Sequence, residues 1–357
     1  MRLFITVIAL SFLAAAPAAS QSSGSTIAKA RGKGMEFPQD GFASRGADWF
    51  CGAQALRFAD NCLTFQTPAG GWPKNMDLVS RPRSIQTSRP DFDDTGTFDN
   101  NGTIPQIRFM AAMYKATHQQ RFLDAYRRAL DFVFQAQYPN GGWPQFYPHP
   151  ANYQVKITFN DDAMTNVMAF LLRLSNDNSP WVDAATRRRA QEAFDRGVEC
   201  ILKCQIRVNG QLTGWCAQHD PNTFEPAKAR PYELPSISGS EGAYILDLLM
   251  DIQEPSPAVR ASINAAAAWF ERSKITGIRL GRVNGDRVVI ADPNAQPIWA
   301  RFYDIATNKP MFCGRTGVVK WSIAEIDPDR RNGYNWYTRR PAWVLEKYKK
   351  WRETHGE

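Results

Sequence analysis

A short glycine-tryptophan motif returns along this chain at a nearly constant interval. Gly-Gly-Trp-Pro begins at Gly70 and again at Gly141, and a shorter version, Gly-Trp-Cys-Ala, begins at Gly214. The three starts lie 71 and 73 residues apart, and each copy follows a helical pattern that ends in glutamine. An interval of this length holds about two helices and their connections, so the repeat predicts an array of helix hairpins that bury a shared core.

The spacing of apolar residues supports a mostly helical fold. One segment of strand-like alternation stands out, Arg282 to Val289, where Asn284-Gly285 predicts the turn of a β-hairpin. Helical patterns cover 104–114, 122–137, 161–174, 184–205, 239–252, 257–272 and 341–352. Three hairpins that close on themselves would form a toroid with the Gly-Trp loops gathered at one end.

The tryptophans of these loops have two possible places. Trp72, Trp143 and Trp215 could line a groove and stack on the faces of sugar rings. Alternatively, they fill the core beneath the loops, as large apolar side chains commonly do. We take Trp72 and Trp143 as candidate substrate-binding residues.

The first residues have the composition of a secretory signal. Met1-Arg2 precedes the apolar run 3–13, and small residues follow as far as Ser20. We therefore expect a signal peptide over 1–20, a flexible leader rich in Ser, Gly, Lys and Arg over 21–35, and one catalytic domain over 36–357. No later apolar run approaches the length that spans a bilayer. We expect a secreted or periplasmic monomer with no membrane partner.

The net charge points to an anionic partner. The formal net charge is +8 and the isoelectric point is near 9.2. Such a surface attracts polyanions, although it can also serve solubility alone. Zinc-finger spacing, RNA-binding aromatic signatures and long basic runs are all missing from the sequence, and export also argues against a nucleic-acid partner. An acidic extracellular polysaccharide fits better.

Six cysteines enter an oxidising compartment if the chain is exported, so we expect some of them to form disulfides. The sequence does not choose among the possible pairings. Cys200 and Cys204 lie four apart on an expected helix, which makes them awkward partners for each other. A zinc site is a weaker alternative, because no paired Cys-x-x-Cys accompanies them.

Acidic residues cluster before two of the expected helices. One cluster runs from Asp93 to Asn101 and includes Asp99, and the other, 158–164, includes Asp161 and Asp162. One carboxylate at each place could simply cap its helix. Several carboxylate and amide oxygens together are what a hard cation such as calcium requires, with ligands that converge from separate loops.

A charged loop pinned by three prolines, 225–236, lies between two expected helices. Pro231 favours an extended conformation for Arg230, so this loop should present the cation outside a helix. Arg230 is our candidate catalytic residue. The alternative is a structural ion pair with Glu225 or Glu233.

Six motifs in order along the chain resemble polysaccharide lyase family 10, the pectate lyases. They are Gly-Gly-Trp-Pro-Lys-Asn at 70–75, Phe-Asp-Asn-Asn-Gly-Thr at 98–103, Gly-Gly-Trp-Pro-Gln-Phe-Tyr-Pro at 141–148, Ile-Thr-Phe-Asn-Asp-Asp-Ala-Met at 157–164, Ala-Arg-Pro-Tyr-Glu-Leu-Pro-Ser-Ile-Ser at 229–238, and Arg-Phe-Tyr at 301–303 through Gly314-Arg315. The resemblance implies an all-α, (α/α)3 toroid with long loops and minor β-structure. It also implies calcium-assisted β-elimination on polygalacturonate.

The resemblance also implies roles for single residues. Arg230 would be the base, Asp99 and Asp161 would lie at the calcium and substrate-carboxylate site, and Lys74 and Arg315 would contact substrate carboxylates. The family pattern has Asp directly after the arginine of the Gly-Arg motif, whereas Thr316 follows Arg315 in this chain. The departure bears on how Arg315 is oriented.

The chemistry explains why cations should gather here. Elimination removes the proton at C5 of a uronate and expels the oxygen at C4, so negative charge grows on the neighbouring carboxylate and preplaced cations stabilise it. An arginine base must be desolvated beside other cations to lose its proton. Two other classes remain open: a helical-toroid glycoside hydrolase that uses Asp99 and Asp161 as its carboxylate pair, and a pectin-binding protein without catalysis. A serine hydrolase is poorly supported, since Ser238-Gly-Ser-Glu-Gly lacks the first glycine of a nucleophile elbow.

Overall fold

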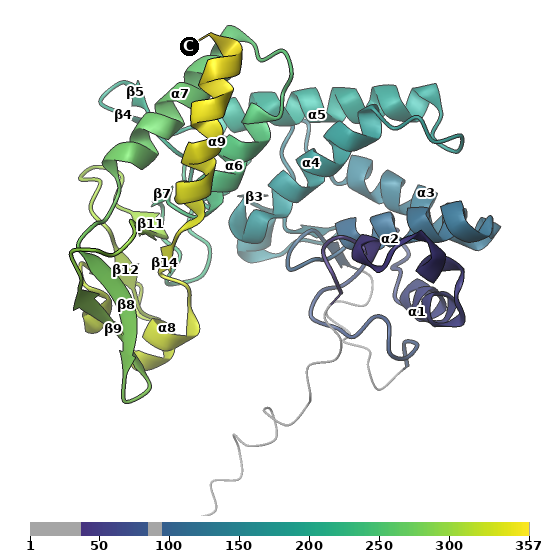
Figure 1. Cartoon of the computed structure of the whole chain (residues 1–357), viewed down its shortest axis with the longest axis horizontal. Helices are drawn as coiled ribbons and strands as arrows, with labels where there is room; N and C mark the ends of the chain where they lie inside the picture. The colour runs from purple at the N-terminus through teal and green to yellow at the C-terminus, as the bar shows by residue number, and fades with distance from the viewer. Residues whose placement is uncertain (1–36, 85–94, 357) are drawn as a thin grey trace, which may run out of the picture. The chain divides into compact units, whose positions relative to one another are not determined.

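The computed structural model describes residues 37–84 and 95–356 (Figure 1). The chain divides into two units, residues 1–34 and residues 35–357. The expected signal peptide and leader lie outside the described residues, as does the start of the first acidic cluster. The description below concerns the second unit.

Helices dominate the described part of the chain. Their bounds are α1 (Ala53–Leu63), α2 (Ile104–Thr117), α3 (Gln120–Gln135), α4 (Ala163–Ser175), α5 (Ala184–Cys204), α6 (Glu241–Met250), α7 (Pro257–Arg272), α8 (Pro328–Gly333) and α9 (Arg340–His355). Within 37–84 and 95–356 we find no helix with the length and apolar character needed to cross a membrane.

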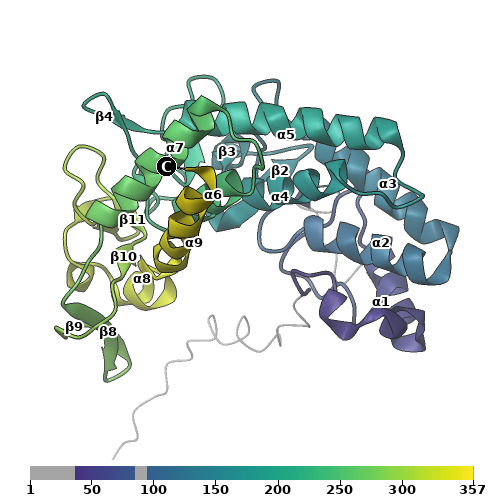
Figure 2. The ribbon, with the colours of Figure 1, turned by 45° about the horizontal axis from the view of Figure 1, so that its top comes forward.

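The helices pair as hairpins. Helix α2 packs on α3, α4 on α5, and α6 on α7, while α2, α4 and α6 also contact one another in that order. Helix α1 packs against α2, and α9 packs against α6 and α7 (Figures 1 and 2). The predicted all-α toroid of helix hairpins with minor β-structure is thereby confirmed.

Local sequence explains where these hairpins begin. Asp183 caps α5 by accepting a hydrogen bond from the Thr186 amide at 2.7 Å, and Ser256 caps α7, whose first residue is Pro257. In α3, Phe122, Tyr126 and further apolar residues at helical spacing form one buried face. Burial of such faces against neighbouring helices supplies most of the stability of the array.

The strands are short and occur in antiparallel pairs. The pairs are β1 (Gly96–Thr97) with β2 (Phe146–Tyr147), β3 (Ile157–Thr158) with β6 (Gln218–His219), β4 (Arg207–Val208) with β5 (Gln211–Leu212), β7 (Ile237–Ser238) with β11 (Phe302–Tyr303), β8 (Ile278–Val283) with β9 (Asp286–Ala291), β10 (Trp299–Ala300) with β14 (Tyr337–Thr338), and β12 (Phe312–Cys313) with β13 (Val319–Lys320). The predicted hairpin is present as β8 and β9, with positive φ at both Asn284 and Gly285.

The tryptophans of the repeat fill the core. Trp72, Trp143 and Trp215 are fully buried. Each indole Nε1 donates to a main-chain carbonyl near the end of the preceding helix, at Cys62 (2.9 Å), Val133 (2.9 Å) and Ile201 (2.8 Å). The prediction that Trp72 and Trp143 stack on sugars is therefore wrong, because a ring with no exposed surface cannot contact a substrate.

The glutamines before the repeat tie successive hairpins together. Gln66 Nε2 donates to the carbonyls of Gly70 and, in the next hairpin, Ala125. Gln137 makes the same two bonds to Gly141 and Ala193. Gln205 Nε2 likewise donates to the carbonyls of Thr213 and, in the next hairpin, Ser262. Because each amide nitrogen donates to two separate segments of the chain, it fixes the register between neighbouring units.

A fourth copy of the repeat was not recognised in the sequence. Trp299 is buried and its indole donates to the Phe270 carbonyl at 2.8 Å, as the earlier tryptophans do at their helix ends. The strand pairs follow the same pattern, since β2, β6 and β11 each begin three residues after one of these tryptophans. The β8–β9 hairpin lies between α7 and Trp299 and lengthens the interval.

All six cysteines are free thiols in the structure, and five of them are buried. The expectation that some pair as disulfides is wrong here. The buried thiols pack as small apolar side chains instead, and burial raises the pKa of Cys216.

Candidate active site

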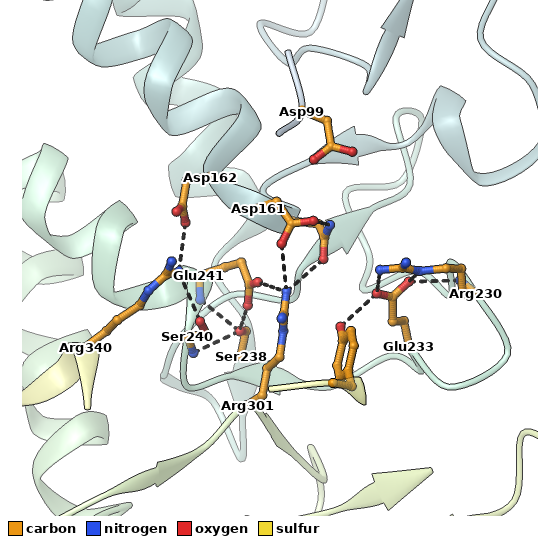
Figure 3. Close-up of polar contacts among 12 residues, drawn as sticks. Asp99, Asp161, Asp162, Arg230, Glu233, Ser238, Ser240, Glu241, Arg301 and Arg340 are labelled. Atoms are coloured by element: carbon orange, nitrogen blue, oxygen red, sulfur yellow. Dashed lines mark hydrogen bonds and ion pairs between the residues drawn. The ribbon is translucent and has the colours of Figure 1, made fainter. Parts of the chain in front are cut away.

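Acidic residues meet near the starts of α2, α4 and α6, because a short strand and then an acidic residue come at the beginning of each of these helices. Asp99 follows β1, Asp161 follows β3, and Glu241 follows β7. Asp161 and Asp162 both have positive φ, at 50° and 63°, which turns the chain sharply from the short helix η4 (Asn160–Asp162) into α4. The repeat thus brings carboxylates from three hairpins to one region (Figure 3).

Asp99 is a buried carboxylate with one oxygen in use. Its Oδ2 accepts from the Lys74 ammonium and from Gln145 Nε2 at 2.6 Å. Its Oδ1 is buried without a hydrogen-bond partner among the described residues. Burial raises the pKa of Asp99, and the Lys74 charge partly offsets that rise. The structure therefore brings Lys74 and Asp99 together.

Asp161 faces Asp99 from the next hairpin. Its side chain is 36% exposed, and the two carboxylates are close enough for the charge of Asp161 to raise the pKa of Asp99 further. Asn160 Nδ2 donates to Asp161 Oδ2 at 2.7 Å, and Arg301 Nη2 lies 3.4 Å from Asp161 Oδ1. Asp161 thus keeps surface open to solvent while its other contacts hold it in place.

Arg301 is a buried cation that the sequence argument did not assign. Its Nη2 contacts the carboxylates of Glu241 and Asp161 and the Asn160 amide oxygen, the last at 3.1 Å. Burial would lower the pKa of Arg301, but the Glu241 carboxylate outweighs it and the pKa is raised. A signal was available: Arg301 follows Trp299 by two residues, as Lys74 follows Trp72.

Arg230 forms an ion pair with Glu233, which is one of the two partners that the sequence analysis named for it. Its Nε donates to Glu233 Oε2 at 2.7 Å, and its Nη2 donates to Oε1. Burial would lower the pKa of Arg230, but the hydrogen bond and charge of Glu233 outweigh burial and raise it. Its ion-pair partner is an anion, and two other guanidinium groups, those of Arg301 and Arg330, lie over aromatic rings that Arg230 also contacts.

Tyr334 links the two arginines and was also missed. Its hydroxyl donates to Glu233 Oε1 at 2.8 Å, and the centre of its ring lies 4.7 Å from the Arg301 guanidinium carbon and 5.9 Å from that of Arg230. Both contacts suit the negative face of an aromatic ring. Tyr334 therefore joins the Arg230 loop to the carboxylates around Arg301.

Tyr153 lies within electrostatic range of both Arg230 and Asp99. Burial raises the pKa of its phenol, and the charges of Arg230, Glu233 and Asp99 all act on that pKa. Tyr153 lies on the short helix η3 (Asn152–Val155). The base candidate and the buried carboxylate thus border the same part of the molecule.

Asp162 points away from this space. Its Oδ1 accepts from Arg340 Nη1 at 3.1 Å, and Arg340 also donates to Ser240 Oγ at 3.1 Å (Figure 3). Burial raises the pKa of Asp162 to about 7, and the Arg340 charge partly offsets that rise. Asp162 thus links the start of α4 to Arg340 at the start of α9.

Arg315 lies on an exposed turn. Its Nε donates to Asp329 Oδ2 at 2.8 Å, and both side chains are more than half exposed. The structure shows no contact between Arg315 and Asp99 or Asp161. A surface ion pair of this kind contributes about 0–1 kcal/mol, so Arg315 can exchange Asp329 for another anion at little cost.

The donor set fits a hard cation in part. Asp99 offers a buried carboxylate oxygen without a partner and Asp161 offers an accessible one, both oxygen ligands of the kind that calcium prefers. Within 37–84 and 95–356, however, no three His, Cys, Asp or Glu side chains are grouped to hold a metal. Two carboxylates alone leave a calcium ion short of ligands, so further oxygens would have to come from water or substrate.

Comparison with known proteins places these residues in a family. A sequence model described as pectic acid lyase matches residues 66–345. The family 10 polysaccharide lyase from Cellvibrio cellulosa has a similar structure at 31% identity and a TM-score of 0.74, covering 89% of this chain and 98% of that one. A point mutant of a family 10 polysaccharide lyase from the same organism, in complex with trigalacturonic acid, matches at 32% identity and a TM-score of 0.75, covering 88% and 99%. No protein with a curated function matches the chain.

Proposed function

The chain belongs to the pectic acid lyase family and is a pectate lyase, and we propose that it cleaves polygalacturonate by a calcium-assisted β-elimination in which Arg230 is the base. The observation that carries this proposal is the meeting of Asp99 and Asp161 beside Lys74 and Arg301, with Asp99 Oδ1 left without a partner among the described residues. The product would be an unsaturated oligogalacturonide.

Asp99 and Asp161 would hold the calcium ion. When bound, it would draw electron density from the uronate carboxylate and stabilise the charge that grows there during elimination. Lys74 already neutralises part of the charge of Asp99 and opposes the rise in the Asp99 pKa that burial causes. Since the chain offers few ligands, we expect calcium to bind more tightly when polygalacturonate is present.

Lys74 and Arg315 would contact carboxylates of the substrate. The Lys74 side chain is 19% exposed, so part of it is open to solvent while its ammonium contacts Asp99. Arg315 is 63% exposed on the turn between β12 and β13. A polymer with one carboxylate on each sugar unit could satisfy both cations from different units.

Arg230 would take the C5 proton from the uronate. Two of its nitrogens donate to Glu233, and no described residue accepts a hydrogen bond from Nη1. We therefore propose that Nη1 is the nitrogen that meets the substrate. Because Glu233 raises the pKa of Arg230, its neutral form is scarce near pH 7, and we expect the rate to rise with pH well into the alkaline range.

The decisive experiment is incubation of the protein with polygalacturonate and calcium, with absorbance followed in the ultraviolet. An unsaturated product supports elimination. Incorporation of labelled water at the cleaved bond would indicate a hydrolase, and binding without product would indicate a pectin-binding protein. We also propose that the chain is exported and acts as a monomer, which mass measurement of the secreted protein would test.

A further inference from the structure

Trp321 is an exposed aromatic ring at the end of β13, on the hairpin that packs against the Arg230 loop. All eleven tryptophans lie in the described part of the chain, and Trp321, 54% exposed, is the most accessible of them. Trp343, the next at 40%, packs edge to face on Tyr244, with ring centres 5.7 Å apart. Trp321 contacts no other aromatic ring among the described residues. An accessible indole of this kind can pack on the apolar face of a sugar ring.

The segment that carries Trp321 packs on the Arg230 loop. It comprises the β12–β13 hairpin and the turn between its strands, and Trp321 directly follows β13. The Cys313 thiol donates to the Pro231 carbonyl at 3.7 Å. A Cβ added at Gly317 would stand 3.5 Å from that same carbonyl and 3.9 Å from Lys228 Nζ. The turn therefore lies directly against the residues that flank Arg230.

Two cations without a carboxylate partner among the described residues belong to this region, Lys228 beside the turn and Lys320 on β13. Lys228 is exposed on the Arg230 loop and Lys320 is half-buried on β13. Neither forms an ion pair with a carboxylate within the described residues, whereas Arg315, on the turn itself, has Asp329. Exposed Val318, at 56%, adds apolar surface beside them. The combination of an apolar platform with spare positive charge suits a sugar chain that carries carboxylates.

We infer that Trp321, with Lys228 and Lys320, forms an outer subsite that binds galacturonate units beyond those at the cleaved bond. This inference rests on the proposed function, because it takes the same polymer as the occupant. The indole would pack on the apolar face of a sugar ring, and the two ammonium groups would meet its carboxylate or the next one. Long chains would gain affinity from the subsite, and short oligomers confined to the centre of the site would not.

The test measures binding to full-length protein in an Arg230→Ala background, so that substrate is not consumed. Polygalacturonate and trigalacturonate are each titrated, with calcium, into that protein and into versions that also carry Trp321→Ala or Trp343→Ala. We expect Trp321→Ala to weaken polygalacturonate binding about tenfold and trigalacturonate binding less than about twofold. Trp343→Ala, the matched exposed tryptophan, should change neither.

Three results would overturn the subsite: no loss with Trp321→Ala, an equal loss with Trp343→Ala, or an equal loss for the two ligands. A second arm replaces Lys228 and Lys320 with alanine, which should flatten the salt dependence of polygalacturonate binding; an unchanged dependence also counts against the inference. Failure of the proposed chemistry would look different. Unmodified protein would then yield no unsaturated product, whatever the binding ratios are.

Discussion

Arg230 and Glu233 form a two-point ion pair in which Nε and Nη2 of the guanidinium both reach one carboxylate, with the Nε bond at 2.7 Å. The pair holds the charged form of the residue that we propose as the base. A structural role alone would make such a pair merely stabilising. If Arg230 is the base, Glu233 also sets the pH range of activity, because it raises the pKa of Arg230.

Glu233→Gln should therefore shift the rate–pH profile to lower pH. Removal of the anion lowers the pKa of Arg230, and each unit of that fall gives about ten times more neutral guanidine at a fixed pH below the pKa. Initial rates between about pH 7 and 11 test the shift. Tyr334→Phe is the control, since it removes the hydrogen bond from the Tyr334 hydroxyl to Glu233 but leaves the Glu233 charge. A shift to higher pH would argue against the assignment.

Arg230→Lys should lose about 10²–10⁴-fold in kcat while the protein stays folded. Lysine keeps the charge but cannot place a nitrogen where Nη1 lies, nor can it make both bonds to Glu233. The change is measured with saturating polygalacturonate and calcium, and circular dichroism checks the fold. A variant that retains the wild-type rate at every pH would show that another group takes the proton.

Removal of calcium should abolish elimination, and its return should restore it. Asp99→Asn and Asp161→Asn should each weaken calcium binding by about tenfold or more, because each replaces a charged oxygen ligand by a neutral one. Calorimetric titration with and without trigalacturonate measures the affinity. Asp131→Asn, at an exposed ion pair with Arg189, is the control. Full turnover in excess chelator would exclude a calcium requirement.

Trp72→Ala should destabilise the fold by about 3–5 kcal/mol, as expected for a fully buried tryptophan. It also removes the hydrogen bond from the indole to the Cys62 carbonyl. Chemical denaturation measures the loss, and Trp321→Ala should by contrast cost less than about 1 kcal/mol at its exposed position. A Trp72→Ala protein of unchanged stability would contradict the placement of this ring in the core.

His219 should make the fold sensitive to mild acid. Burial lowers the pKa of His219 to about 4, from about 6.5 when unfolded, so the unfolded chain binds the extra proton between these values. The free energy of unfolding is therefore unaffected by this group above about pH 6.5. It falls by about 3 kcal/mol in all as the pH drops towards 4. Melting temperatures across this range test the trend. His219→Gln should flatten it, and an unchanged slope would point to other groups.

How far the sequence predicts this molecule depends on how local each signal is. The Gly-Trp repeat predicted the hairpin array because every copy of the motif closes the same local contacts, as at Trp72 and Trp143. It could not say which way the rings face, because periodicity carries spacing and not exposure. Arg301 and Tyr334 were missed because their partners come from distant segments, although the spacing from Trp299 to Arg301 repeated that from Trp72 to Lys74.

The repeat also shows where this architecture accepts added sequence. The β8–β9 hairpin enters between α7 and Trp299 without disturbing the bond from that indole to the Phe270 carbonyl. At its tip, a Cβ on Gly285 would meet no atom within 4 Å. The turn at Asn284-Gly285 is therefore a suitable insertion site for an affinity tag or a fluorescent protein. The insert would extend from the β8–β9 hairpin, and the hydrogen bond from Trp299 to Phe270 would remain.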